Sequence, residues 1–437
     1  MAGEDKLKTI NDYFNYLYKL ERTGMKYDLS NITKLCLALN NPQDKFKSIH
    51  IAGTNGKGAT ASFIASVLQD HGYKTGLFTS PHILNFNERI RINGKCINNA
   101  YIKRFLTENL TLIKRIKPSF FEVNTALAFK YFSDKNVEVA VIECGLGGRL
   151  DSTNIITPDV SVITQIDMDH MQFLGNSLKQ IAMEKLGIVK QDVKVIVSDN
   201  NSKLIKLFHK VVPKKDLLYL DDISKSKILK NSGNGLEFTI SPNDGKSIKI
   251  STPLSGKYQI RNAAAAYFAV NEFLRVNNKA FSIPIFKQGI KNVKLNTGYF
   301  GRLEVLKLKG NRYLLDVSHN PDGIKNALNS AKSIKFIPDV VIFGIMSDKD
   351  HKNALKELLP FAKNIIFTKP EYDRALESRI LYSAATKLLG KSGFMVAESV
   401  KDSLSIAEKM KHRNIMILGS FFMVSDALKA LGINKLT

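Results

Sequence analysis

The sequence predicts an α/β protein of two domains, in which a mostly parallel sheet flanked by helices is followed by a smaller Rossmann-like α/β domain. Three observations support this prediction. Short apolar runs rich in β-branched residues alternate with longer segments of helical spacing, which is typical of parallel sheets covered by helices. The alternation begins again near residue 302. The length of 437 residues suits two or three domains of roughly 100–200 residues each.

The predicted elements of the first domain follow the chain in strand–helix order. Near-continuous hydrophobicity at 139–142 favours a strand that is covered on both faces. The segments between the apolar runs have the spacing of amphipathic helices. The predicted strands are 47–52, 74–79, 137–144, 159–166 and 193–198. The predicted helices are 60–71, 100–116, 122–133 and 177–189.

The pattern changes at about 201–255, where short polar segments carry the turn signals NSGNG and SPNDG. Such signals predict hairpins, so we expect a β-rich lobe here. We divide the chain into domains at 1–298 and 299–437 and expect a ligand cleft between them. The strands predicted for the second domain are 312–317, 339–343, 364–368 and 414–418.

The composition is that of a globular chain, with 44% hydrophobic and 24% charged residues. No apolar run approaches the roughly 18–20 residues that a membrane-spanning helix needs. The first residues lack the basic and apolar pattern of a secretory signal. The three cysteines, Cys36, Cys96 and Cys144, have neither metal-ligand spacing nor an even count. We therefore expect a cytoplasmic protein without a membrane partner.

The formal charge of +24 arises from 64 basic and 40 acidic side chains. Lysines are spread along the whole chain, as at Lys114, Lys117 and Lys225, which indicates a solvated, lysine-rich surface. The alternative is a field that attracts polyanionic substrates such as nucleotides or polycarboxylates. Because no basic stripe interleaved with aromatic residues is present, we expect no nucleic-acid partner.

A glycine-rich segment, GTNGKG at 53–58, joins the first predicted strand to a helix. Glycines let successive N–H groups face inward, and the helix N-terminus together with Lys57 adds positive charge, so the segment predicts a P-loop-type domain that cradles a triphosphate. The match is imperfect, because Ile51 stands at the first glycine position and Gly58 where a hydroxyl would reach magnesium. A tight strand-to-helix turn is the alternative.

Magnesium ligands are therefore expected from other strand ends. Ser80 follows the second predicted strand, Glu143 ends the third, and His170 closes the segment DMDH after the fourth. The carboxyl ends of parallel strands meet at one edge of a sheet, so these groups should converge on the glycine-rich segment. A hydroxyl, a carboxylate and an imidazole suit a magnesium ion that keeps waters and phosphates. Each residue alone could equally be a solvated or hydrogen-bonded loop residue.

Motifs along almost the whole chain resemble the folylpolyglutamate synthase/dihydrofolate synthase family, the folate branch of the Mur ligase superfamily. In the first domain they are GTNGKG (53–58), TSPH (79–82), FNERI (86–90), FFEVNTALAF (120–129), ECGLGGRLDSTN (143–154), DMDH (167–170) and EKLGI (184–188). Further along the chain they are RNAAAA (261–266), GRLE (301–304), LDVSHNPDG (315–323), GIMSDKD (344–350) and LGSFF (418–422). The stretch 119–123 resembles the bifunctional bacterial type.

The resemblance implies ATP-dependent amide bond formation. A substrate carboxylate attacks the γ-phosphate of ATP to give an acyl phosphate, and the amine of L-glutamate then displaces phosphate. The substrates implied are ATP, L-glutamate and either dihydropteroate, which gives dihydrofolate, or reduced folates that receive further γ-glutamyl residues. Magnesium, with two ions expected, and a carbamylated lysine complete the site. A monomer is expected.

The resemblance also assigns roles to individual residues. The residues implied in ATP binding are Thr54, Asn55, Gly56, Lys57, Gly58, Asn262, Arg302 and Asp316. The metal ligands implied are Ser80, Glu143, His170 and Lys185, where Lys185 would be the carbamylated lysine. The catalytic residues implied are Lys57, Glu143, His170 and Lys185. Without the motif, Lys185 would be read as a surface lysine of a helix.

Substrate contacts are also implied. The pterin pocket would use Ser119, Phe120, Phe121, Glu122, Leu150, Asp151 and Ser152. The incoming glutamate would use His319 and Ser420. An aromatic pair can stack on a flat pterin, and a carboxylate can pair with its amino-pyrimidine edge. Plain core packing is the alternative for the two phenylalanines.

Three positions depart from the family pattern without removing a charged or metal-binding group, namely Ala59, Met171 and Leu186. Several alternatives stay open on the sequence alone. They are an enzyme that only extends the glutamate tail, a Mur-like ligase acting on another carboxylate, a binding module without turnover, and a nucleic-acid-dependent P-loop ATPase.

Overall fold

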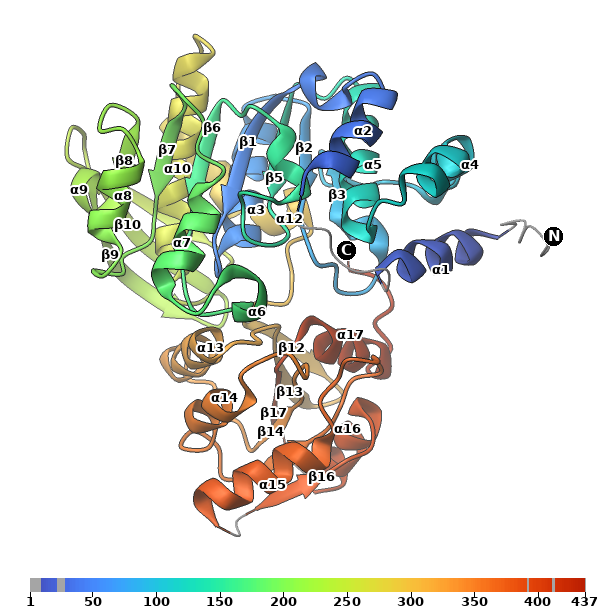
Figure 1. Cartoon of the computed structure of the whole chain (residues 1–437). Coiled ribbons are helices and arrows are strands. Elements are labelled where there is room, and N and C mark those ends of the chain that lie inside the picture. Colours follow the sequence, from blue (N-terminus) through green and yellow to red (C-terminus); the bar gives the residue numbers. More distant parts are fainter. Residues whose placement is uncertain (1–8, 22–27, 391–392, 411–412, 437) are drawn as a thin grey trace, which may run out of the picture.

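The computed structural model describes residues 9–21, 28–390, 393–410 and 413–436. It has a large N-terminal α/β domain and a smaller C-terminal one, which lie one above the other in Figure 1. This confirms the predicted fold class. Among the described residues, no helix is both long and apolar enough to cross a membrane.

An eight-stranded sheet forms the centre of the N-terminal domain, in the order β4-β3-β2-β5-β1-β6-β7-β8. All neighbouring pairs are parallel except β2–β3 and β3–β4. The strands are β1 (Lys47–Ala52), β2 (Thr75–Phe78), β3 (Ile90–Ile92), β4 (Lys95–Cys96), β5 (Val139–Glu143), β6 (Val160–Ile163), β7 (Lys194–Val197) and β8 (Leu217–Tyr219). Because β1 lies between β5 and β6, the loop that follows β1 lies at the middle of the carboxyl edge.

Helices cover both faces of this sheet, and successive residues of β5 point to opposite faces, as the pleat requires. Val139 and Val141 belong to one core, with α3 (Lys57–Asp70), α10 (Gln259–Val276), α11 (Ile283–Lys291) and α12 (Val293–Thr297). Ala140 and Ile142 belong to the other, with α1 (Ile10–Glu21), α2 (Ser30–Ala38), α4 (Asn99–Ile116) and α5 (Phe120–Asp134). A third apolar cluster involves β6, β7, α6 (Met171–Leu174), α7 (Leu178–Leu186) and α8 (Ile205–Val211). Short helices complete the domain, namely α9 (Leu220–Ile223), η1 (Pro42–Lys45), η2 (Phe86–Arg89) and η3 (Ser152–Ile155).

The β-rich lobe is shorter than the predicted 201–255. It is an antiparallel sheet of β9 (Ser224–Ser232), β10 (Gly235–Pro242) and β11 (Ile248–Thr252), in the order β11-β10-β9. The residues before it instead form α8 and the strand β8, which continues the main sheet beside β7. The edge strand β9 exposes Lys225, Lys227 and Lys230 to solvent.

The C-terminal domain has a six-stranded sheet in the order β12-β13-β17-β14-β15-β16, in which only β12 is antiparallel to its neighbour. Helices pack on both faces around two cores. The strands are β12 (Glu304–Leu308), β13 (Asn311–Asp316), β14 (Val340–Phe343), β15 (Ile365–Phe367), β16 (Phe394–Val396) and β17 (Asn414–Leu418). The helices are α13 (Pro321–Ser333), α14 (His351–Leu358), α15 (Ser378–Leu389), α16 (Val400–Lys409) and α17 (Phe421–Ala430).

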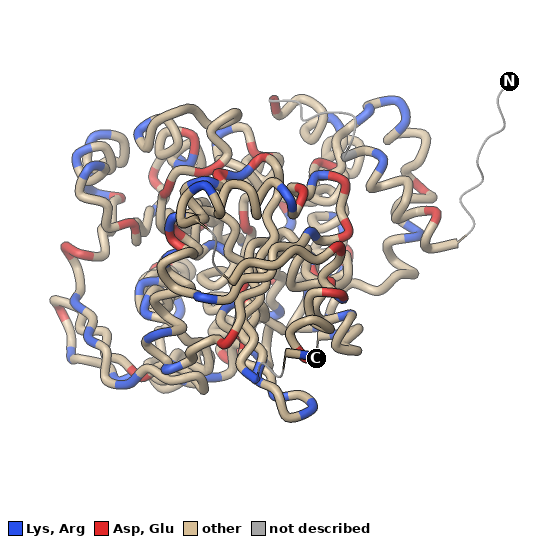
Figure 2. The backbone as a smooth tube through the Cα atoms, turned by 90° about the horizontal axis from the view of Figure 1, so that it is seen from below, with Lys and Arg blue, Asp and Glu red and all other residues tan. Residues whose placement is uncertain are grey.

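Lys and Arg positions are distributed over both domains, with Asp and Glu between them (Figure 2). This distribution agrees with the solvated, lysine-rich surface expected from the sequence.

A glycine sets the distance between α11 and the phosphate-loop helix α3. A Cβ atom on Gly289 would lie 2.5 Å from the Cα of Val67, and the Gly289 carbonyl accepts a hydrogen bond of 2.6 Å from the Ser66 hydroxyl. We expect Gly289→Ala to force the helices apart and lower the free energy of unfolding by about 1–3 kcal/mol. The check is the thermal unfolding midpoint by calorimetry. Gly245→Ala is the matched control, because its nearest neighbour would lie 3.7 Å away, and an equal shift in both variants would contradict the prediction.

Candidate active site

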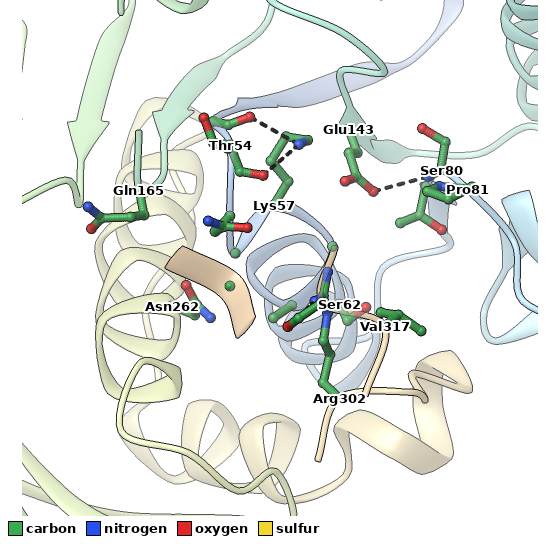
Figure 3. A pocket seen from close by; sticks show the side chains of 18 of the residues that line it. Thr54, Lys57, Ser62, Ser80, Pro81, Glu143, Gln165, Asn262, Arg302 and Val317 are labelled. Carbon is green, nitrogen blue, oxygen red and sulfur yellow. Dashed lines mark hydrogen bonds between the residues drawn. The ribbon is translucent and has the colours of Figure 1, made fainter. Parts of the chain in front are cut away.

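A cavity of about 640 Å³ lies between the two domains. Its wall combines the phosphate loop, the ends of β2, β5 and β6, the linker at 297–302 and the loop after β13. Figure 3 shows side chains from both domains around it. The predicted residues that line it are Thr54, Asn55, Gly56, Lys57, Gly58, Ser80, Glu143, His170, Lys185, Asn262, Arg302 and His319.

The phosphate loop is anchored to the neighbouring strand end. The backbone N–H groups of Thr54 and Asn55 donate to the Gln165 carbonyl at 2.7 and 3.1 Å, so these two groups hold the loop in place instead of facing a ligand. Gly56 adopts a φ of 92°, and a Cβ there would lie 2.6 Å from Asn262 Oδ1. Both the backbone conformation and the contact with Asn262 therefore require glycine. The helix α3 begins at Lys57, earlier than the predicted residue 60.

Lys57 lies across its own loop. Its Nζ donates to the carbonyl oxygens of Gly53 at 3.0 Å and Thr54 at 3.2 Å (Figure 3). A lysine at the N-terminus of a helix, beside the loop that leads into it, is an arrangement that neutralises a bound phosphate.

Glu143 ends β5 inside the cavity wall. Its Oε2 accepts a hydrogen bond of 3.1 Å from the Ser80 N–H (Figure 3). Burial raises the pKa of Glu143 to about 7, although nearby Lys57 and the Ser80 N–H favour the ionised form. A Cβ on Gly58 would lie 3.6 Å from Glu143 Oε2, so the carboxylate faces the first turn of α3. A cation bound to phosphate at that helix would ionise this carboxylate further.

His170 follows β6 and carries a neutral ring at neutral pH. Burial and Lys349 lower its pKa to about 4, against the opposing effect of Asp169. Its Nε2 accepts from Lys349 Nζ at 3.2 Å. A neutral imidazole nitrogen is the form that binds a metal.

Lys185 is not a surface lysine. It lies in the last turn of α7 with an exposed fraction of 3%, and its Nζ donates to the Gly53 carbonyl at 2.9 Å. Burial and the charge of Lys57 lower its pKa to about 7. A neutral amine is therefore present near neutral pH, which is the form that acts as a nucleophile.

The loop after Glu143 holds the backbone around Lys185. A Cβ on Gly148 would lie 2.8 Å from the carbonyl oxygens of Glu184 and Lys185. Arg149 Nη2 bonds Glu184 Oε1 at 2.9 Å. Two predicted motifs, ECGLGGRLDSTN and EKLGI, thus form one packed unit.

The second domain contributes Arg302 to the cavity. Its Nη1 lies 4.0 Å from Asp316 Oδ1, and its Cζ lies 5.6 Å from the ring centre of Phe421. Asp316 does not line the cavity. The Asp316 carboxylate accepts from the N–H groups of Leu303 at 3.0 Å and Ser318 at 2.8 Å, so it fixes the loops that carry Arg302. The geometry gives Asp316 a positioning role where the sequence predicts direct ATP contact.

The two residues predicted to contact glutamate differ in position. His319 lines the cavity, with its Nδ1 donating to the Val317 carbonyl at 3.0 Å. Ser420 does not line it, because the Ser420 hydroxyl accepts from the Met423 N–H at 3.0 Å and caps α17. The cavity wall at this helix is instead formed by Phe421.

The residues predicted for the pterin lie outside the cavity. Ser119 and Glu122 form a reciprocal cap at the start of α5, with distances of 2.6 and 3.3 Å. Phe120 packs into the core beneath α1, and the Phe121 ring lies where a side chain on Gly145 would be. One feature still points to a ligand, because the buried Glu122 Oε1 has no hydrogen-bond partner among the described residues.

Leu150, Asp151 and Ser152 do not line the cavity either. Asp151 is buried, and its carboxylate accepts from the Leu146 N–H at 2.8 Å and from the Thr153 N–H at 3.0 Å. These bonds shape the turn after β5. That the seven residues assigned to the pterin pocket bind a pterin therefore stays a prediction.

A buried polar chain lies behind this turn and was not predicted. His50, in the middle of β1, bonds the Thr153 hydroxyl at 2.8 Å and the Cys144 thiol at 3.1 Å. Thr153 in turn bonds Asp151 at 2.5 Å. These hydrogen bonds connect β1, which leads to the phosphate loop, with the segment that follows Glu143.

The donor set suits a magnesium ion that is held mainly by its substrate. In the part of the chain that the structure describes, no group of three or more His, Cys, Asp and Glu side chains is arranged to hold a metal by itself. Magnesium commonly uses one or two carboxylates and completes its shell with phosphates and waters. One buried carboxylate, Glu143, beside the Ser80 segment and the phosphate loop fits that pattern.

Comparison with known proteins identifies the class. The model of the Mur ligase middle domain matches residues 51–270, and that of the Mur ligase glutamate ligase domain matches residues 301–421. Together with the cavity between two α/β domains, these matches define a Mur ligase.

Its relatives place it within that class. The chain is 31% identical over 434 residues to the dihydrofolate synthase/folylpolyglutamate synthase of Bacillus subtilis, covering 96% of this chain and 98% of that protein. It is 35% identical over 365 residues to the folylpolyglutamate synthase of Lacticaseibacillus casei, covering 81% and 84%. The structure of Mycobacterium tuberculosis folylpolyglutamate synthase complexed with ADP and AMPPCP matches with a TM-score of 0.86 at 28% identity, covering 97% and 99%.

The chain therefore belongs to the folylpolyglutamate synthase/dihydrofolate synthase family and is an ATP-dependent amide-forming ligase. ATP is its co-substrate, and its partners are small molecules. The family resemblance that the sequence motifs indicated is confirmed.

The buried His50 predicts an acid-sensitive fold. Burial lowers its pKa from 6.5 to about 3, so the unfolded chain binds a proton more tightly than the folded chain. Stability should therefore fall as the pH falls below 6.5, by about 2 kcal/mol between pH 7 and pH 5 from this group alone. We expect His50→Gln to lose less of its thermal unfolding midpoint over that range than the unmodified protein.

The control for this measurement is His209→Gln, which removes an imidazole with an exposed fraction of 46% on α8. The prediction is contradicted when His50→Gln and the unmodified protein lose stability in parallel between pH 7 and pH 5.

Proposed function

We propose that the protein adds L-glutamate to dihydropteroate, giving dihydrofolate, and to the γ-glutamyl tail of reduced folates. The observation that carries the proposal is that Lys57, Glu143 and Lys185 of one domain share a single cavity with Arg302 and His319 of the other. The relatives from Bacillus subtilis and Mycobacterium tuberculosis that are named for both activities support it.

The residues present suit an acyl-phosphate reaction. The substrate carboxylate attacks the γ-phosphorus with loss of ADP, and the glutamate amine then attacks the acyl carbon with loss of phosphate. Lys57 and Arg302 approach the cavity from opposite domains and would neutralise the phosphate charge. Enclosure between two domains would exclude water, which otherwise hydrolyses the activated acyl group.

Magnesium would be held by Ser80, Glu143 and His170 together with the nucleotide phosphates, and we propose two ions. Bound magnesium supplies charge neutralisation on the phosphates. Glu143 provides the buried carboxylate and His170 the neutral ring nitrogen for this role.

We propose that Lys185 is carbamylated. Its neutral amine can add carbon dioxide with release of a proton, which replaces a cation by an anion. An ammonium cannot bind magnesium, whereas a carbamate supplies oxygens. The change would also remove the repulsion between Lys185 and Lys57.

One substrate subsite would lie inside the cavity, and the other behind Gly145, which lines it and contacts the Phe121 ring. His319 would face the incoming glutamate. Glu122, whose buried Oε1 has no hydrogen-bond partner among the described residues, and the neighbouring Phe121 would bind the pterin.

We also propose that the protein acts as a monomer in the cytoplasm, because one chain supplies both walls of the cavity and ATP is a cytoplasmic co-substrate.

The first test follows phosphate release by purified protein with ATP and L-glutamate. We expect turnover with dihydropteroate and with tetrahydrofolate. We expect Glu143→Gln to reduce both by at least about 100-fold, because removing one charged group at a transferring phosphate costs several kcal/mol. Asp402→Asn, which changes an exposed acid at the start of α16, is the control.

Turnover with tetrahydrofolate alone would leave only the tail-extending activity. Turnover with neither folate, but with another carboxylate in a panel of acids and amino acids, would replace the proposal by a Mur-like ligase of different substrate. Phosphate release that nucleic acid stimulates, and that folates leave unchanged, would also contradict it.

The second test concerns carbon dioxide. We expect activity to fall in buffers purged of carbon dioxide and to return on addition of bicarbonate, because carbamate formation is reversible. Lys185→Ala should lose activity under both conditions. Activity that does not change after exhaustive purging would exclude carbamylation of Lys185, whichever substrate the enzyme uses.

A further inference from the structure

The carboxylate of Asp169 is the point at which the second domain contacts the nucleotide-binding edge of the first. Asp169 belongs to the segment after β6, and its side chain has an exposed fraction of 8%. Lys349 Nζ, from the loop after β14, donates to Asp169 Oδ1 at 2.7 Å and is equally buried. Asp169 and Lys349 are 180 residues apart in the sequence, and their buried ion pair connects the two domains.

Two further groups of the second domain meet the other oxygen of the same carboxylate. Asn320 Nδ2 lies 3.4 Å from Asp169 Oδ2, and His319 Nε2 lies 3.8 Å from it. Both residues come from the loop after β13. The carboxyl ends of two parallel strands of the second sheet thus converge on one acid of the first domain.

The same contacts reach the phosphate loop. Asn320 Nδ2 also donates to Asn55 Oδ1 at 3.4 Å, and Asn55 Nδ2 donates to Asp167 Oδ2 at 2.8 Å. Lys349 Nζ lies 3.2 Å from His170 Nε2. The position of the second domain is therefore connected through one network to the loop that holds the phosphates.

Electrostatics favour a fixed arrangement. The Lys349 ammonium and the Asp169 carboxylate are each only 8% exposed, so each charge depends on the other for compensation. Removing either partner of a buried pair leaves the other charge uncompensated, so the pair resists opening unless another anion takes its place. A phosphate in the cavity is such an anion.

We infer that Asp169 is a positioning residue that anchors Lys349 and the loop at 317–320, and thereby sets the glutamate-binding domain against the phosphate site. This inference rests on the proposed function for the identity of the second substrate. In an amide-forming step, the amine has to lie within about 3–3.5 Å of the acyl carbon, and a displacement of about 1 Å can cost 100-fold in rate. Asp169 itself lines the cavity, and the role proposed here is that it acts through the residues it holds.

The kinetic test uses Asp169→Asn in the whole protein. We expect kcat/KM for L-glutamate to fall about 100-fold. The affinity for ADP, measured by calorimetry, should change much less, because the phosphate loop is also anchored to Gln165. Asp192→Asn is the matched control, because Asp192 pairs with Lys215 on the exposed surface of the same domain. A parallel loss of ADP affinity and glutamate turnover would overturn the positioning role, since it would indicate general damage to the nucleotide site.

A double-mutant cycle tests the pair itself. If Lys349 acts through Asp169, the variant Asp169→Asn/Lys349→Met should be no worse than the poorer single variant. Multiplied losses in the double variant would show that the two residues act independently and would overturn the inference. Lys349→Met also keeps the test valid if Asp169→Asn fails to fold.

A structural readout separates this inference from the proposed activity. Cys96 is exposed on the first domain, Cys36 and Cys144 are buried, and Lys409 is exposed on α16 of the second. Spin labels on Cys96 and on Lys409→Cys report the distance between the domains. We expect Asp169→Asn to lengthen or broaden that distance, and an unchanged distribution would overturn the anchor. The measurement stands even if no folate substrate is turned over.

Discussion

The carbonyl oxygen of Gly53 accepts hydrogen bonds from two lysines, Lys57 at 3.0 Å and Lys185 at 2.9 Å. Two lysine side chains directed at one acceptor concentrate positive potential at the end of the central strand. Their repulsion, added to burial, lowers the pKa of Lys185 to about 7. The chemistry of the site depends on this arrangement, because it favours an anion at the loop and makes one of the lysines a neutral amine.

The architecture explains why one cavity collects so many polar groups. Both sheets turn the carboxyl ends of parallel strands toward the same space, as open α/β sheets do at their ligand sites. The first sheet contributes Glu143 and the segment that ends in His170, and the second contributes the loops that carry His319 and Lys349. Groups far apart in the sequence become neighbours because their strands are parallel, and because the two domains face each other at these edges.

Much of the fold and part of the site could be predicted from sequence. Buried parallel strands have a clear apolar signature, and β1 has the bounds predicted for it. The strands β3, β4, β8, β12 and β16 were not predicted. Four of them have only two or three residues, which is too short for a period to show. Ser80, Glu143 and His170 could be placed together by the rule that strand ends converge.

Other parts of the site could not be predicted in this way. The spacing of Ser119 and Glu122 is the signature of a helix start, and the structure uses both residues for that purpose. Ser420 is likewise a helix cap. Lys349 and Asp169 both lie in motifs, GIMSDKD and DMDH, but nothing in the sequence pairs them, because they belong to different domains.

The three lysines along β9 have a consequence for the molecule as a whole. A strand at the edge of a sheet presents unpaired backbone groups on which another chain could add a strand, and charged side chains there discourage such growth. Lys225, Lys227 and Lys230 place like charges on that border, so two copies that approached edge to edge would repel each other. Part of the large positive charge therefore opposes edge-to-edge aggregation of the β9–β11 sheet. This accounts for these lysines without an anionic ligand.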